Sequence, residues 1–116
     1  MNTVSGLNPE QCPVDRTLRV IGGRWKALIL YYLRGGPKRF NELRRMMPSV
    51  TQRMLTQHLR ELEADGVIDR KVFPVVPPHV EYSLSAIGVS LLPVMDAMAD
   101  WGAARAASDL PRTAAA

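Results

Sequence analysis

Hydrophobic residues near the start of the chain recur at the spacing of an α-helix. Val14, Leu18 and Ile21 occupy positions i, i+4 and i+7 after Pro13, a residue suited to a first helical turn. The glycine pair at 22–23 then interrupts the pattern. These features predict a short amphipathic helix that begins at Pro13 and ends before the glycines.

A second helix is predicted from Arg24 to Arg34, where the run Gly35-Gly36-Pro37 breaks it. Its hydrophobic stripe consists of Trp25, Leu28, Ile29 and Tyr32. Residues 38–40 fit either a very short strand or the entry to a third helix. The third helix continues to Pro48 and carries Phe40, Leu43 and Met47 at helical spacing.

A fourth helix is predicted to run to about Asp65, where Gly66 supplies a C-terminal stop. Its start has two alternatives, because Ser49 with Gln52 matches a capping box, whereas Thr51 can itself be the N-cap. Three leucines of this helix cluster within about 60° of a helical wheel and are expected to face the core. They are Leu55, Leu59 and Leu62.

After Gly66 the helical period gives way to alternation. Two strands are predicted at 67–73 and 80–84, with a proline-stiffened loop between them. Ser85 is a suitable N-cap for a last helix from about Ala86 to Ala104, which Pro93 should kink. The order of elements predicts a mainly α fold with a small β-hairpin, of the α+β class.

A length of 116 residues and a mass of 12.9 kDa fit a single domain. We expect a flexible arm at 1–11, a folded domain at 12–105 and a disordered tail at 106–116. Cys12 is the one cysteine, which excludes an internal disulfide and a multi-cysteine zinc site. No glycine-rich phosphate loop, paired carboxylates or metal-ligand spacing points to an enzyme, a cofactor or a metal. With no long apolar run and no secretory signal, we expect a cytoplasmic protein without a membrane partner.

Basic charge is concentrated in one segment of the chain. Residues 34–60 hold seven cations and one acid, Glu42, so this segment has a net charge of +6. The whole chain has a net charge of +4, so the residues outside this segment together carry −2. Localised basic charge is typical of a surface that binds a polyanion. A solvated basic face without a partner is the alternative.

The fourth helix separates its charges along its length. Opposite the leucines fall Arg53, Thr56, Gln57, Arg60 and Ala64. The acids are confined to its C-terminal end. A helix that enters a DNA major groove with its N-terminus first brings its early residues to the bases, where Arg can pair with guanine and Gln with adenine. The pattern favours a DNA-reading helix over an ordinary amphipathic helix with a solvated face.

The flanking segments fit a helix-turn-helix with a wing. The third helix contributes Arg39, Asn41, Arg44 and Arg45, and a short turn with Pro48 joins it to the reading helix. Ser49, Thr51 and the free N–H groups of the first turn can bind a phosphate oxygen. The two strands would form the wing, whose cations are Arg70 and Lys71, with His79 near its tip. An exposed strand face is the alternative for Arg70 and Lys71.

Several motifs together closely resemble the HxlR-type winged helix-turn-helix regulators of bacteria and archaea. The resemblance is collinear from Cys12 to Gly102 and rests on Cys12-Pro13-Val14, Ile21-Gly22-Gly23-Arg24-Trp25, Gly36-Pro37-Lys38-Arg39-Phe40-Asn41-Glu42-Leu43, Leu55-Thr56-Gln57-His58-Leu59-Arg60-Glu61-Leu62-Glu63, Asp65-Gly66 and Val80-Glu81-Tyr82-Ser83-Leu84. It implies a homodimeric transcription factor, paired through its first and last helices, on a pseudo-palindromic operator in double-stranded DNA. The groove-facing set that it implies is Thr51, Gln52, Arg53, Thr56, Gln57 and Arg60. The family commonly has Lys or Arg before Val-Glu-Tyr, where this chain has His79.

The resemblance also bears on Cys12. Some members use a thiol at this position to sense electrophiles or oxidants, and a small-molecule effector is therefore an expected partner. A small apolar residue beside a helix start is the alternative. Because the chain has no second cysteine, the Cys12 thiol can form three kinds of product: an intersubunit disulfide, a mixed disulfide or an adduct.

The last helix carries more apolar surface than a domain of this size is expected to leave wet. Packing on the core of its own protomer is one explanation, and dimerisation is the other. The interface that we expect consists of Val14, Leu18, Leu91, Met95, Met98, Trp101 and Gly102. For the whole chain, the alternative to a DNA-binding regulator is a winged-helix module that binds protein without DNA.

Overall fold

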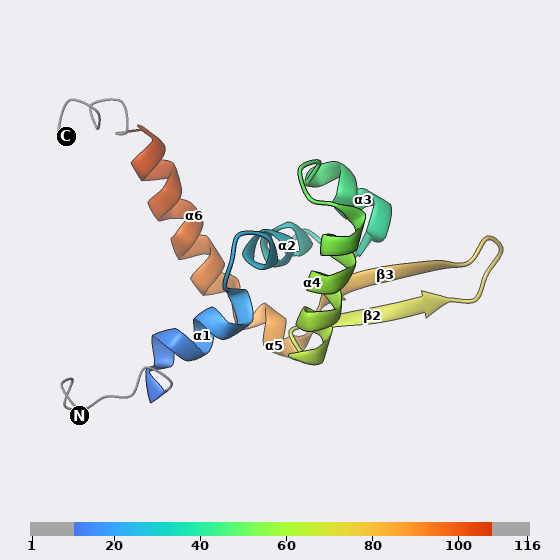
Figure 1. Ribbon diagram of the computed structural model, residues 1–116, viewed down its shortest axis with the longest axis horizontal. Helices are drawn as coiled ribbons and strands as arrows, with labels where there is room; N and C mark the ends of the chain where they lie inside the picture. Colours follow the sequence, from blue (N-terminus) through green and yellow to red (C-terminus); the bar gives the residue numbers. More distant parts are fainter. Residues whose placement is uncertain (1–10, 108–116) are drawn as a thin grey trace.

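The computed structural model describes residues 11–107. In chain order its elements are α1 (Pro13–Ile21), α2 (Trp25–Leu33), β1 (Lys38–Arg39), α3 (Phe40–Met46), α4 (Gln52–Ala64), β2 (Ile68–Phe73), β3 (His79–Leu84), α5 (Ala86–Val89) and α6 (Leu92–Ala107). Figure 1 shows the β2–β3 hairpin projecting from one side of the central helices and α6 from the other. The predicted winged helix-turn-helix class is confirmed. Most of the predicted arm and tail lie outside the described residues.

The core lies where the central helices meet the sheet. The three leucines of α4 are buried as predicted, with Leu55 and Leu62 at 0% exposure and Leu59 at 1%. The other residues of the core are Ile21, Ile29, Leu30, Leu33, Leu43, Met47, Val50, Val67, Ile68 and Met95. Each fully buried Leu or Ile side chain stabilises the fold by about 1.5–3 kcal/mol relative to exposure. This packing fixes the rotation of α4 and directs its opposite face outward.

Local hydrogen bonds define both ends of α4. The Thr51 hydroxyl accepts a hydrogen bond from the backbone N–H of Met54 at 3.0 Å, so Thr51 is the N-cap and the alternative start at Ser49 is wrong. Gly66 has a positive φ of 78° directly after the helix, a conformation that strains any residue with a Cβ. The polypeptide therefore turns sharply from α4 into β2.

The sheet has three antiparallel strands in the order β1-β3-β2. Both alternatives for residues 38–40 apply in part, because Lys38–Arg39 forms β1 and α3 begins at Phe40. Lys38 pairs with Tyr82 and Arg39 with Glu81, which ties the start of α3 to the middle of β3. The β2–β3 hairpin forms the wing, with Phe73 opposite His79 as its last pair before the loop.

The expectation of a single kinked helix from Ala86 to Ala104 is wrong. The segment forms two helices, α5 and α6, with a break at residues 90–91. Pro93 has no N–H to donate to the carbonyl of Val89, and its ring excludes that carbonyl, so α5 ends and a new helix begins. α6 also runs to Ala107, three residues beyond the predicted end, through an alanine-rich stretch that favours helix. Within the described residues, no helix combines the length and hydropathy needed to cross a membrane.

Candidate nucleic-acid interface

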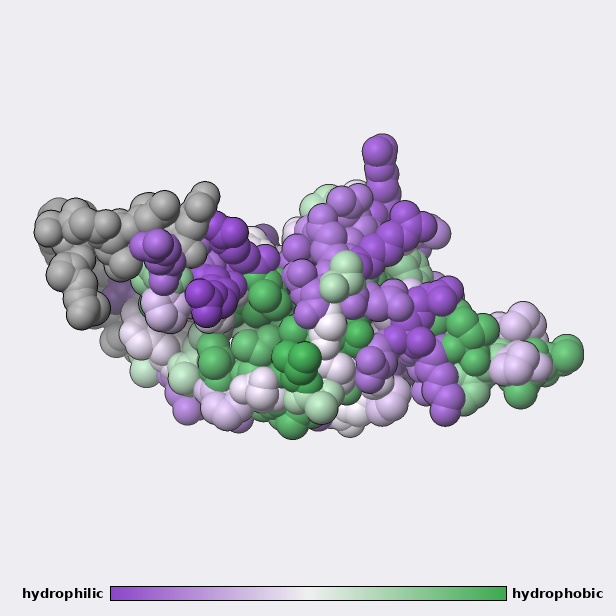
Figure 2. Space-filling model, turned by 90° about the horizontal axis from the view of Figure 1, so that it is seen from below, coloured by the Kyte–Doolittle hydropathy of each residue, from purple (hydrophilic) through white to green (hydrophobic). Residues whose placement is uncertain are grey.

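The outward face of α4 presents most of the residues expected to meet DNA. Thr56 is half-buried, and the exposed members are Thr51, Gln52, Arg53, Gln57 and Arg60. The acids Glu63 and Asp65 are exposed at the opposite end of the helix. The polarity predicted along α4 is therefore present on its surface. Figure 2 shows hydrophilic residues gathered over the central part of the molecule, up to the start of the wing.

Gln57 is exposed, and its side-chain amide already has a partner. Its Nε2 donates a hydrogen bond to Oε2 of Glu61 at 3.0 Å, and Oε1 of Glu61 lies 2.9 Å from Nζ of Lys26 on α2. The hydrogen bond from Lys26, followed by the one from Gln57, lowers the pKa of Glu61 from 4.5 to about 2. The second N–H of this amide and its Oε1 remain available to another partner.

Ion pairing separates the cations of the molecule into two groups. Three cations away from the outward face of α4 each pair with a carboxylate: Lys26 with Glu61, Arg34 with Asp96 and Arg19 with Asp15. Within residues 11–107, no carboxylate lies within 4 Å of Arg39 at the end of β1 or of the cations on α3, α4 and β2. These are Arg39, Arg44, Arg45, Arg53, Arg60, Arg70 and Lys71. Guanidinium and ammonium groups without an internal partner are available to a polyanion.

The turn between α3 and α4 is anchored by buried residues and leaves polar ones outside. Met47 and Val50 are 2% and 4% exposed, while Ser49 between them is exposed. Arg39, the N-cap residue of α3, and Asn41 in its first turn are also exposed. The Glu42 side chain accepts the backbone N–H of Arg39 at 2.8 Å, so the one acid of the basic segment caps α3. One oxygen of the single carboxylate in residues 34–60 is therefore used inside the protein.

The wing carries its polar residues on its strands and not on its loop. Arg70 and Lys71 are exposed on β2, and Nζ of Lys71 lies 4.8 Å from the ring centre of Phe73. His79 stacks on Phe73 with ring centres 4.6 Å apart, and its Nε2 lies 3.3 Å from Oε2 of Glu81. The loop beyond, residues 74–78, has no charged residue, and its Val76 is 98% exposed. Figure 2 shows this end of the wing in pale and hydrophobic colours.

The sequence did not reveal that α3 and the wing lie side by side. The two-residue strand β1 pairs with β3 and brings the first turn of α3 next to His79. The only local signal was the pair Lys38–Arg39, which fitted a strand as well as a helix start. The pairing of Lys26 with Glu61 was also missed, because it joins two helices far apart in the sequence.

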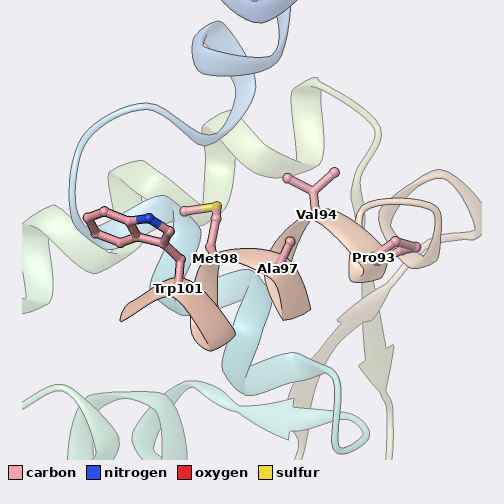
Figure 3. Close-up of a pocket in the computed structure, with 5 residues that line it drawn as sticks. All are labelled: Pro93, Val94, Ala97, Met98 and Trp101. Atoms are coloured by element: carbon pink, nitrogen blue, oxygen red, sulfur yellow. The ribbon is translucent and has the colours of Figure 1, made fainter. Parts of the chain in front are cut away.

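The predicted interface residues divide between the core and the surface. Met95 is 3% exposed and belongs to the core of its own protomer, and Leu91 packs against that core. Exposed apolar residues remain on α1 and α6: Val14 at 66%, Leu18 at 54%, Met98 at 47% and Trp101 at 71%, together with exposed Gly102. Figure 3 shows Val94, Met98 and Trp101 pointing to the same side of α6. With Pro93 and Ala97 they line an open apolar hollow of about 660 Å³.

Cys12 stands directly before α1 as its N-cap residue. Its carbonyl accepts the backbone N–H of Arg16 at 3.0 Å, and its thiol makes no capping hydrogen bond. The side chain is half-buried. A thiol that does not cap the helix is free to react without disrupting a hydrogen bond of the fold.

Comparisons with known proteins agree with this geometry. The sequence profile of the HxlR-like helix-turn-helix family matches residues 20–109. The HTH-type transcriptional regulator YybR of Bacillus subtilis is 57% identical over 95 residues, which cover 82% of this chain and 76% of YybR. YtfH of Escherichia coli, also an HTH-type transcriptional regulator, is 48% identical over 95 residues, covering 82% and 75%.

Solved structures of two other regulators are also similar. The redox regulator HypR in its oxidised form has a TM-score of 0.78 and 56% identity, covering 80% of this chain and 96% of HypR. The reduced form of the transcriptional regulator YodB from B. subtilis has a TM-score of 0.70 and 37% identity, covering 78% and 90%. A diamide-treated form of YodB is similar as well, with a TM-score of 0.68.

Proposed function

The chain belongs to the HxlR-like helix-turn-helix family of transcriptional regulators, and we propose that it acts as a homodimer that reads a pseudo-palindromic DNA site with α4. The observation that carries the proposal is the outward face of α4. Arg53 and Arg60 lie there opposite a buried leucine stripe, without a carboxylate within 4 Å among the described residues. This geometry suits insertion into a major groove with the N-terminus leading.

The turn and the neighbouring elements supply contacts to the DNA backbone in this proposal. Ser49 and Thr51 at the N-terminus of α4, and Arg39 and Asn41 at the start of α3, bind phosphates, which fix the register of the helix. Arg70 and Lys71 extend the basic surface along the wing. The remaining positions of α4, Gln52, Arg53, Thr56, Gln57 and Arg60, face the groove and carry the specificity.

Dimerisation follows from the need for specificity and from an uncovered apolar surface. One recognition helix reads only a few base pairs, so useful discrimination requires two copies with half-sites about 34 Å apart. Residues 100–107 of α6 are all exposed, and a helix without packing is marginal in water. A second copy that covers Met98 and Trp101 with its own α1 and α6 would stabilise this segment.

Cys12 is the site through which an oxidant or electrophile acts in this proposal. The support is the position of its thiol before α1, next to the proposed dimer surface, and the similarity to HypR, which is named a redox regulator. Oxidation by diamide removes two electrons and two protons from two thiols and joins them as a disulfide. With one cysteine per chain, the second thiol comes from another copy or from a small thiol.

The proposal is tested by selecting a duplex from a random library with the wild-type protein. The selected site should contain two inverted half-sites, and binding should depend steeply on salt. Failure to enrich any sequence, together with affinity that does not change with salt, would contradict it.

A further inference from the structure

The side-chain amide of Gln57 is held at one of its ends. Its Nε2 donates a hydrogen bond to Oε2 of Glu61 at 3.0 Å, one turn further along α4. An exposed glutamine without such a partner can turn over, because the two ends of an amide are similar in shape, and can present either a donor or an acceptor. Glu61 removes this freedom, since an ionised carboxylate only accepts hydrogen bonds. With its pKa at about 2, this carboxyl is ionised at neutral pH.

Glu61 is held in turn by the helix behind it. Its Oε1 lies 2.9 Å from Nζ of Lys26 on α2 and 3.7 Å from Nδ1 of His58. The side chain of Lys26 is only 15% exposed, so its ammonium group has little room to leave this contact for a DNA phosphate. The two oxygens of Glu61 therefore have separate roles: one is bound to the body of the domain, and the other is bound to Gln57.

The core fixes the two helices that carry these groups. Leu30 of α2 and Leu59 and Leu62 of α4 belong to the same buried cluster. Lys26 lies one turn before Leu30, and Glu61 directly precedes Leu62 in the chain. The packing of α2 against α4 therefore places the ammonium group beside the carboxylate before any DNA is bound.

The fixed amide matches one base edge in the major groove. With one N–H directed to Glu61, the polar groups left on the Gln57 amide are its second N–H and Oε1. Adenine offers the complement, since its N6–H donates and its N7 accepts. Guanine presents two acceptors, O6 and N7, so Oε1 in a fixed orientation opposes one of them. A free amide, in contrast, can turn its N–H groups toward guanine.

We propose that Glu61, held by Lys26, is a positioning residue that fixes the amide of Gln57 so that it selects adenine at one position of each half-site. The inference rests on the proposed function and deepens it, because it names the base that one residue of α4 reads and the contacts that determine the choice. Lys26 and Glu61 act only through Gln57. A residue of α2, outside the recognition helix, then contributes to the sequence preference of the protein.

The first test measures the preference for adenine over guanine. Selection from a random library with the wild type and with Gln57→Ala identifies the position at which Gln57 determines the base. At that position the wild type should bind the adenine duplex about tenfold more tightly than the guanine duplex, and Gln57→Ala should bind the two alike. A wild-type preference for guanine there, or the absence of any position that depends on Gln57, overturns the inference.

The second test removes each end of the contact between Lys26 and Glu61. Glu61→Gln and Lys26→Met should each lower the adenine preference to about threefold or less, whereas Lys26→Arg, which keeps a cation, should retain it. Loss of an acid also strengthens binding to every duplex through charge alone. Glu63→Gln is the matched control for that effect, because it removes an exposed acid of the same helix, and it should tighten both duplexes equally. A tenfold preference that persists in either folded variant, Glu61→Gln or Lys26→Met, overturns the inference.

The third test asks whether Glu61 acts through Gln57. In the Gln57→Ala background, Glu61→Gln should change the ratio of the two affinities no further, since the amide that it orients is absent. In the protein without DNA, the side-chain NH₂ signals of Gln57 in an NMR spectrum should move in Glu61→Gln and in Lys26→Met but not in Glu63→Gln. An effect of Glu61→Gln on the ratio that persists without Gln57, or NH₂ signals that do not move, overturns the inference.

The same measurements distinguish failure of this inference from failure of the proposed function. If the wild type enriches no sequence, the proposed function fails and the inference fails with it. If the wild type discriminates between duplexes and Glu61→Gln retains the adenine preference, this inference alone is defeated.

Discussion

Lys26 on α2 and Glu61 on α4 form an ion pair with Nζ 2.9 Å from Oε1, and this pair keeps an acid of the recognition helix turned toward the protein. The same carboxylate accepts a hydrogen bond from Gln57. The pair thus neutralises a carboxylate that would otherwise repel DNA phosphates, and it links α4 to the body of the domain.

Glu61 predicts a pH dependence of stability. Its pKa in the folded protein is about 2, below its ordinary value of 4.5, so the folded state binds fewer protons than the unfolded state between these values. Its contribution to stability is fully present above pH 4.5 and is lost as the pH falls toward 2. Glu61→Gln should therefore lower the melting temperature at pH 6, and its deficit should shrink between pH 4.5 and 3. A deficit that stays constant across this range would show that the ion pair contributes nothing.

The apolar side of α6 predicts a dimer that can be separated without unfolding. Met98 and Trp101 are 47% and 71% exposed, so replacing both by Asp should leave the protomer fold intact. Sedimentation should give twice 12.9 kDa for the wild type and 12.9 kDa for Met98→Asp/Trp101→Asp.

Met95→Ala is the matched control for this dimer prediction. Met95 is 3% exposed, so the substitution leaves a cavity in the core and should lower the free energy of unfolding by about 2–5 kcal/mol. It should do so without changing the oligomeric state of the folded protein. A Met98→Asp/Trp101→Asp protein that still sediments as a dimer would place the interface elsewhere.

Cys12 predicts an oxidant response that depends on a single thiol. Diamide should change the DNA affinity of the wild type, and dithiothreitol should restore it, because the product is a disulfide. Cys12→Ser should bind DNA as the reduced wild type does and should ignore diamide. Non-reducing electrophoresis then distinguishes an intersubunit bond from a mixed disulfide. A diamide response that persists in Cys12→Ser would exclude a thiol mechanism, since the chain has no other cysteine.

Local signals predicted much of the fold. The leucine stripe of α4 and its stop at Gly66 depend on residues within one helix and its ends, and they were correct. The choice between Ser49 and Thr51 as N-cap needed the structure, because both residues have a hydroxyl that can accept from the backbone. Helix period and capping chemistry operate over a few residues, so they can be read without the tertiary fold.

Contacts between distant segments were not predictable in the same way. β1 has two residues, too few for a period, and its pairing with β3 brings the first turn of α3 next to His79. α6 is apolar on several sides, so a helical wheel could not tell that Met95 enters the core while Met98 stays outside. The break before Pro93 was anticipated only as a kink, since the same residue can bend one helix or begin another.

The central claim, that α4 reads DNA, is tested most directly by the affinity of Arg53→Ala for the selected duplex and for a scrambled duplex. We predict a loss of about 1–3 kcal/mol on the selected duplex, a much smaller loss on the scrambled one, and a steep salt dependence on both. Arg34→Ala, with its guanidinium held by Asp96, should behave as the wild type. Unchanged discrimination between the two duplexes in Arg53→Ala would contradict the assignment of α4 as the recognition helix.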